Sequence, residues 1–125
     1  MKKIATEKAP AAVGPYSQGI IFDRLVFSSG QIPLDPVTQQ MVEGDFKSQV
    51  RRVLQNLAMV LEAGGASLDT VIKTTCFLAD MKDFAEFNEV YKEFFTSDCP
   101  PARSCVQAQL PKNARVEVEA IASLK

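Results

Sequence analysis

The sequence contains no histidine and no tryptophan, and it has no block of basic residues. Histidine is the commonest general base and metal ligand in proteins, so the usual acid–base and metal-binding chemistry is absent here. Any reaction must then use carboxylates, a guanidinium, hydroxyls, backbone groups and water. We therefore expect a site that holds no metal.

Charge and hydrophobicity exclude two large classes of partner. The 125 residues carry a net charge of −1, and both signs are spread along the chain. Binding to nucleic acid or to an anionic membrane usually requires a concentrated basic surface, so we expect neither. The apolar runs are too short to span a bilayer, and residues 1–8 lack the apolar core of a signal peptide.

The three cysteines, Cys76, Cys99 and Cys105, are odd in number and match no zinc or redox motif. Without a signal peptide, the simplest interpretation is three free thiols in a reducing cytosol. The sequence thus predicts a cytoplasmic protein. Its length and its apolar content of 46% fit a single globular domain over residues 1–125.

Two segments have the apolar period of a helix, and several others resemble strands. Asp45 is placed to cap the first helix, its apolar stripe runs from Phe46 to Leu61, and Gly64-Gly65 ends it. The second helix starts at Asp83 and Glu86, which resemble a capping box. Its apolar stripe consists of Phe84, Phe87, Tyr91 and Phe95. Segments rich in β-branched and apolar residues predict strands at 18–22, 25–29, 71–78, 102–110 and 115–123.

The order of these elements is hairpin, helix, strand, helix, strand, strand. Hairpins mixed with helical crossovers favour an α+β fold with one mixed sheet and both helices packed on one face. The chain has no third helix to cover the other face of the sheet. Homo-oligomerisation through that open face is the natural solution.

Arg103 is the first candidate for chemistry, because it lies in a segment that otherwise predicts a buried strand. A guanidinium there is costly unless an anion meets it, and its planar fork suits a carboxylate. The alternatives are a structural ion pair with Glu117 or Glu119, or an exposed position at the rim. The sequence alone leaves these interpretations open.

Glu117 and Glu119 come next, and they share one strand face because side chains alternate along a strand. A glutamate among apolar neighbours can have a raised pKa and can then hold or deprotonate a water. Arg115 shares that face, so the alternative is a cross-strand ladder of charges.

Four further residues give weaker signals. Asn88 lies on the apolar stripe of the second helix and favours a structural hydrogen bond to a nearby loop. Tyr16 follows a turn and favours packing. Gly30 ends a strand, where glycine allows close approach of a ligand but more often marks a bulge. Cys105 lacks an activating base and favours the role of a small buried hydrophobe.

Together these residues form motifs that resemble the Rid family, also called the YjgF family, and most closely its RidA subgroup of reactive intermediate deaminases. The resemblance runs over residues 6–122, and its motifs fall in the family's order. The motifs are Gly14-Pro15-Tyr16-Ser17-Gln18, Ser29-Gly30-Gln31-Ile32-Pro33, Pro101-Ala102-Arg103-Ser104-Cys105, Val116-Glu117-Val118-Glu119-Ala120-Ile121-Ala122 and the segment from Phe84 to Phe95.

The resemblance implies a chorismate-mutase-like fold with a mixed six-stranded sheet, and a homotrimer with a barrel-like core and clefts between subunits. It also implies a 2-iminobutanoate/2-iminopropanoate deaminase. Such enzymes hydrolyse the imines and enamines released by pyridoxal-phosphate dehydratases to 2-oxo acids and ammonia, without a cofactor.

The resemblance further assigns roles to individual residues. Arg103 matches the arginine that grips the substrate carboxylate, and Glu117 matches the glutamate that positions the attacking water. Glu119 is then the partner that does not carry the reaction. The other positions that it places in the cleft are Tyr16, Gly30, Asn88 and Cys105, the last through its backbone.

Three other functions compete with this interpretation. A non-catalytic module that binds small carboxylates, or a chaperone-like module, would need Arg103 but would tolerate loss of Glu117. Nucleic-acid binding or cleavage would need a basic patch, which the net charge argues against. A chorismate-mutase-type rearrangement rests on analogy of fold alone.

Overall fold

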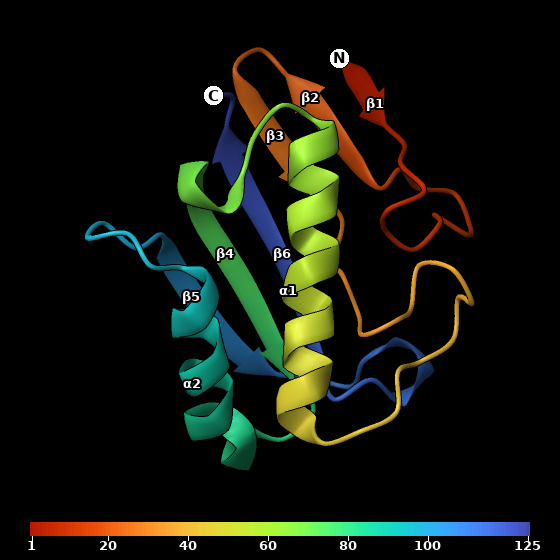
Figure 1. Ribbon diagram of the computed structural model, residues 1–125, viewed down its shortest axis with the longest axis vertical. Coiled ribbons are helices and arrows are strands. Elements are labelled where there is room, and N and C mark those ends of the chain that lie inside the picture. The colour runs from red at the N-terminus through yellow and green to blue at the C-terminus, as the bar shows by residue number, and fades with distance from the viewer.

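The computed structural model describes residues 1–125 as one mixed sheet with two helices on the same face (Figure 1). The six strands lie in the order β1-β2-β3-β6-β4-β5. Neighbouring strands are antiparallel except β4 and β5, which are parallel. The elements are β1 (Lys2–Ile4), β2 (Gly19–Phe22), β3 (Leu25–Ser28), α1 (Phe46–Ala63), β4 (Val71–Leu78), α2 (Phe84–Phe94), β5 (Ala102–Gln107) and β6 (Val116–Ser123). The predicted α+β fold with a six-stranded mixed sheet and both helices on one face is confirmed.

The hydrophobic core lies between the sheet and the two helices. Alternate residues of β6, such as Val116 and Val118, are fully buried there, because side chains alternate between the two faces of a strand. The apolar stripe of α1 covers them, and its Leu54 and Leu57 are also fully buried. Each such leucine contributes about 1.5–3 kcal/mol through its removal from water.

The ends of α1 lie where the sequence predicts them. The carboxylate of Asp45 accepts a hydrogen bond from the backbone N–H of Ser48 at 2.8 Å, which satisfies one of the free donors of the first turn. At the other end the N–H of Gly64 donates to the carbonyls of the last turn. Gly65 follows with a φ of +88°, a conformation that favours glycine.

The capping box predicted at the start of α2 is wrong. The side chain of Asp83 makes no hydrogen bond to the helix; it accepts one from Nη2 of Arg115 at 3.0 Å instead. A distant cation therefore competes successfully with the local backbone for this carboxylate. A short 3₁₀ turn (Met81–Asp83) leads into the helix, and Asp80 caps that turn.

The sequence did not predict β1, and it placed the end of β5 too late. β1 has only three residues, two of them lysine, and it exists because it pairs with β2 rather than through its own pattern. The strand predicted at 102–110 ends at Gln107. None of the helices is long and apolar enough to cross a membrane.

The second face of the sheet has no covering layer within the chain. Phe22 on β2 is 60% exposed and Phe27 on β3 is 38% exposed. Glu117 and Glu119 on β6 project from this same face, since their neighbours Val116 and Val118 point toward the helices. We call this surface the open face.

Candidate active site

Glu117 projects from the open face of β6 into a pocket of about 650 Å³. The pocket brings together three of the predicted site residues, Tyr16, Gly30 and Glu117, although they come from three separate segments of the chain. The segments meet because the backbone of Gln31 bonds to that of Val118 on β6, and because Ser29 N donates to Gln18 O at 2.9 Å. The other lining residues are Pro10, Ala11, Val13, Gln18, Ser29, Gln31, Ile32, Leu34, Gln39, Pro111, Lys112 and Glu119.

Gly30 leaves the space that the carboxylate of Glu117 occupies. A Cβ atom added at Gly30 would overlap a carboxylate oxygen of Glu117 and would lie 2.8 Å from its Cδ. The glycine therefore leaves room for the side chain of Glu117 at this position. The backbone N–H of Gly30 donates to no carbonyl in the chain and remains available to a ligand.

Burial raises the pKa of the Glu117 carboxyl, and the nearby negative charge of Glu119 raises that pKa further. Its register partner on β4 is Phe77, whose ring supplies an apolar neighbour on the same face. Glu117 forms none of the ion pairs in the chain. A half-buried, unpaired carboxylate with a raised pKa is suited to accept a proton from water.

The alternative of a charge ladder through Arg115 is wrong. The guanidinium of Arg115 pairs with Asp83 and lies over the ring of Phe46, 4.8 Å from its centroid. Arg115 thus turns toward the helices and away from both glutamates. Glu119 is exposed and also has no ion-pair partner in the chain.

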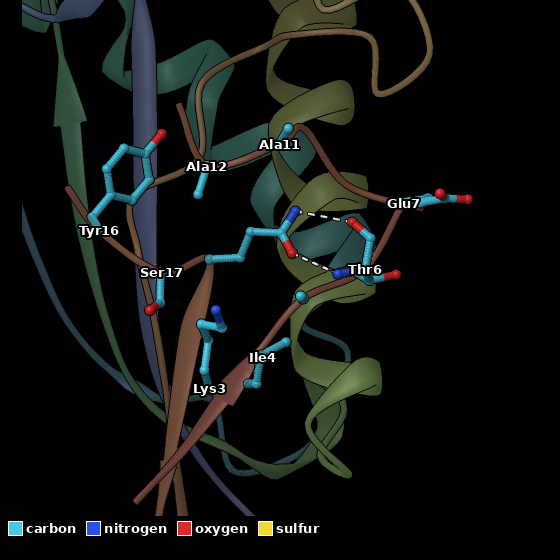
Figure 2. Close-up of a pocket in the computed structure, with 10 residues that line it drawn as sticks. Lys3, Ile4, Thr6, Glu7, Ala11, Ala12, Tyr16 and Ser17 are labelled. Carbon is cyan, nitrogen blue, oxygen red and sulfur yellow. Dashed lines mark hydrogen bonds between the residues drawn. The ribbon is translucent and has the colours of Figure 1, made fainter. Parts of the chain in front are cut away.

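The loop that carries Tyr16 is held by Gln18, a residue that the sequence analysis did not single out. The side chain of Gln18 accepts a hydrogen bond from Thr6 N at 2.7 Å and donates to Thr6 O at 3.0 Å (Figure 2). It also donates to Pro10 O at 2.7 Å. A buried amide with several backbone partners fixes an otherwise irregular segment, and glutamine next to the Gly-Pro turn was the available signal.

The pocket drawn in Figure 2 is a second one, with a volume of about 390 Å³. Lys3, Glu7 and Tyr16 are among its lining residues, and neither Arg103 nor Glu117 belongs to it. We therefore assign no chemistry to it.

Arg103 lies on β5, an edge strand, and on the helix-covered face, since its register partner Thr74 is buried there. Its Nη1 donates a hydrogen bond of 2.7 Å to Oδ1 of Asn88 on α2. Its guanidinium carbon lies 5.4 Å from the centroid of Phe84 and 4.9 Å from that of Tyr91. The loop contact predicted for Asn88 is thus replaced by a contact with the arginine.

Arg103 makes no ion pair in the chain. The structural ion pair with Glu117 or Glu119, considered from the sequence, is therefore wrong within the chain. Asn88 accepts a hydrogen bond from one N–H of Arg103. A guanidinium has five N–H donors, so the others remain for a ligand. An exposed cation that contacts neighbouring groups but has no anionic partner is suited to bind an anion.

The cysteines near Arg103 are protonated thiols. Burial raises the pKa of Cys76 to about 12, and burial also raises the pKa of Cys105 despite the opposing charge of Arg103. Cys105 lies beside Cys76 in register and half-buried, so its side chain packs rather than attacks. Its edge strand nevertheless offers backbone groups to a ligand.

Arg103 and Glu117 do not meet in one chain. Arg103 lies on the helix-covered side at the edge of the sheet, and Glu117 lies on the open face two strands away. The candidate residues therefore form two groups. Arg103, Asn88 and Cys105 make the arginine half-site, and Tyr16, Gly30 and Glu117 make the glutamate half-site.

Comparison with known proteins gives a consistent family. The sequence model described as Endoribonuclease L-PSP matches residues 6–124. A 2-iminobutanoate/2-iminopropanoate deaminase of Salmonella typhimurium is 48% identical, over 97% of this chain and 96% of that protein. A RutC family protein of Pyrococcus horikoshii is 52% identical, over 95% and 94% of the two chains.

The fold agrees as closely as the sequence. The crystal structure of E. coli TdcF with bound serine superposes with a TM-score of 0.94 at 44% identity and covers 100% of both chains. The relatives carry several different functional names, but they share this architecture. The chain therefore belongs to the Endoribonuclease L-PSP family, which is the Rid or YjgF family that its motifs resemble.

Proposed function

We propose that this protein hydrolyses reactive 2-imino acids and their enamines, such as 2-iminobutanoate and 2-iminopropanoate, to 2-oxo acids and ammonia. The observation that carries the proposal is the pair of half-sites. One holds an ordered cation without an anionic partner, Arg103, and the other holds a half-buried carboxylate with a raised pKa, Glu117. Family membership and the name of the Salmonella relative support the choice of reaction.

The proposal requires a homotrimer in which each site lies between two subunits. Arg103 and Glu117 lie on opposite sides of one sheet, so they can act on one small molecule only if they come from different copies. The exposed Phe22 and Phe27 support burial of the open face in such an assembly. A closed ring of identical contacts places the arginine half-site of each subunit against the glutamate half-site of the next.

Arg103 binds the substrate carboxylate through its free N–H groups and so fixes the neighbouring imine carbon. Holding the reactants in a productive geometry is a large part of catalysis for such a small substrate. The bound serine named in the TdcF structure is a small molecule with the same carboxylate on the carbon next to nitrogen. Tyr16, Gly30, Asn88 and Cys105 line the remaining walls.

Glu117 accepts a hydrogen bond from a water and takes one of its protons as the water oxygen bonds to the imine carbon. Glu117 then delivers this proton to the imine nitrogen, which gives a tetrahedral amino alcohol. In the second step Glu117 takes the proton of the new hydroxyl group and passes it to the departing nitrogen. The C–N bond breaks, ammonia leaves, the oxygen becomes the carbonyl of the 2-oxo acid, and Glu117 is ionised again. The free N–H of Gly30 supports the polar atoms of this intermediate.

The test couples threonine dehydratase to semicarbazide, which traps the released imine as a semicarbazone that absorbs light. The wild-type protein is expected to suppress semicarbazone formation from the imine by hydrolysing it first. Arg103→Ala should lower kcat/KM for this hydrolysis by at least about thirtyfold, because loss of one partner in a charged contact costs roughly 2–5 kcal/mol. Arg24→Ala, an exposed arginine in the turn between β2 and β3, is the matched control and should act as wild type.

A non-catalytic carboxylate-binding module gives a different result in the same experiment. Such a module would bind 2-oxobutanoate through Arg103 and would leave the rate of semicarbazone formation unchanged. Absence of suppression by the wild-type protein would therefore overturn the proposed reaction.

A further inference from the structure

Three residues of α2 face β5 and surround the guanidinium of Arg103. Phe84, Asn88 and Tyr91 follow one another at intervals of four and three residues, which places them on one side of a helix. Two of them supply aromatic rings and the third supplies an amide oxygen. α2 therefore presents a stripe built to hold a cation.

The stripe is itself held by contacts on its far side. The hydroxyl of Tyr91 shares a hydrogen bond of 2.8 Å with the hydroxyl of the buried Thr74 on β4. Its ring stacks on Phe95 with the centroids 4.4 Å apart. Tyr91 is only 8% exposed, so the ring under Arg103 cannot move without disturbing the core.

The amide of Asn88 meets Arg103 through its oxygen, at 2.7 Å from Nη1. Its Nδ2 donates to no atom of the chain, since no hydrogen bond involves it. The oxygen and the nitrogen of this amide therefore allow two different roles for Asn88. Asn88 either orients the arginine through Oδ1 or contacts substrate directly through the free Nδ2.

Orientation has a clear physical benefit at this position. Arginine has a long side chain that loses about 2 kcal/mol of rotamer free energy when it is fixed. An arginine that is fixed before the ligand arrives does not lose that freedom on binding. Arg103 is exposed and lacks an ion pair, so the stripe of α2 is what orders it.

We infer that Asn88 is a positioning residue that acts through Arg103: its amide oxygen and the rings of Phe84 and Tyr91 fix the guanidinium in its carboxylate-binding orientation. The inference rests on the proposed function and goes beyond the placement of Asn88 in the cleft. Asn88 then needs no contact with the substrate.

A double-mutant cycle tests this role in the semicarbazide assay. Asn88→Ala in the otherwise wild-type trimer should raise KM about tenfold, the effect of one charge-assisted hydrogen bond, and should change kcat by less than about twofold. In an Arg103→Lys background the same change should alter kcat/KM by less than about twofold, because a lysine ammonium lacks the planar fork whose orientation Asn88 is inferred to fix. Lys92→Ala, an exposed residue one turn further along α2, is the control and should behave as wild type.

A second measurement reports on the arginine whether or not the Arg103→Lys variant retains activity. Nitrogen-15 relaxation of the Arg103 Nε–H group, assigned with Arg103→Ala, should show an ordered side chain in wild type and a disordered one in Asn88→Ala. An equally ordered Arg103 in Asn88→Ala would overturn the inference. So would an undiminished effect of Asn88→Ala on kcat/KM in the Arg103→Lys background.

These outcomes are separate from failure of the proposed function. If the wild-type protein does not hydrolyse the imine, the reaction is wrong, and the relaxation measurement still decides whether Asn88 orders Arg103. If the wild type is active and the Arg103 side chain is equally ordered in Asn88→Ala, only the positioning role of Asn88 is overturned.

Discussion

The two faces of the sheet differ in which groups cover them. On the helix-covered face, α1 and α2 bury Val116, Val118 and their neighbours, and the chain itself supplies every contact. On the open face, Phe22 and Phe27 remain exposed beside two unpaired glutamates. The first face is covered by the chain itself, and the second is the surface that we expect a further copy to cover in the proposed trimer.

The comparison also explains why the candidate site is split. Arg103 contacts Asn88 and Tyr91 of its own chain, because it lies at the edge of the helix-covered face next to α2. Glu117 lies on the open face, where its own chain provides an apolar wall and the gap at Gly30 but no cation. Folding therefore prepares each half-site, and assembly is expected to join them.

Phe27→Asp should have the largest effect on assembly and activity, because it places a charge in the middle of the surface that a second copy is expected to bury. The variant should fold with the helix content of wild type, run as a monomer in sedimentation velocity and lose all imine hydrolysis. Val37→Asp is the control, since Val37 is 87% exposed on a loop away from the sheet. A monomeric Phe27→Asp with full activity would show that one subunit contains a whole site.

Glu117→Gln should lower kcat by about 10²–10⁴-fold, the usual contribution of a positioned general base, while 2-oxobutanoate still binds. The thermal stability of Glu117→Gln should not fall with its kcat. The folded pKa of Glu117 is raised by burial and by Glu119, so ionisation of this carboxyl lowers stability as pH rises from the unfolded pKa through the folded one. At neutral pH the glutamine variant, which has no charge to bury, should melt at or above the wild-type temperature.

The pH profile of the wild type provides a further check on the same carboxyl. Activity should fall as pH falls through the raised pKa of Glu117, at a higher pH than for an ordinary glutamate. If Glu119→Gln rather than Glu117→Gln is the inactive variant, the roles of the two carboxylates are reversed.

Gly30→Ala should have an intermediate effect, because the added methyl group would displace the carboxylate of Glu117. We expect a loss of about tenfold in kcat, since a misplacement on the scale of 1 Å already costs a large factor in rate. The clash involves the end of a flexible side chain, so the melting temperature should stay close to that of wild type. Unchanged kcat would show that the observed place of Glu117 does not matter for turnover.

Glu119→Gln should have the smallest effect. Removing its negative charge should lower the pKa of Glu117 and move the acidic limb of the pH profile to lower pH. At neutral pH the rate should change by less than about threefold, because Glu119 is exposed and its charge is screened by solvent. Stopped-flow rates across the acidic limb would measure the shift.

Local pattern was enough to predict the helix-covered half of the molecule. The stripe of α1, its cap at Asp45 and its end at Gly64 follow from short-range spacing, and the structure confirms them. Long-range contacts limited the rest. β1 depends on its partner strand, and Asp83 accepts a hydrogen bond from Arg115, which lies 32 residues away in sequence.

The site shows the same division between local and long-range information. Glu117 and Gly30 could be singled out as residue types in unusual places, but their contact joins segments that only the folded sheet brings together. The pairing of Asn88 with Arg103 likewise depends on a parallel strand and a crossover helix. Spacing along the chain gave no sign that Arg103 and Glu117 would lie on opposite faces.

Subunit mixing tests the central claim most directly. Arg103→Ala and Glu117→Gln should each be inactive alone, and mixed trimers formed by co-expression should contain sites with an intact arginine from one subunit and an intact glutamate from the next. In a random mixture of equal amounts, about a quarter of the clefts should be intact, so about a quarter of the wild-type activity should return. If native mass spectrometry shows mixed trimers and the activity stays at background, the shared site is contradicted.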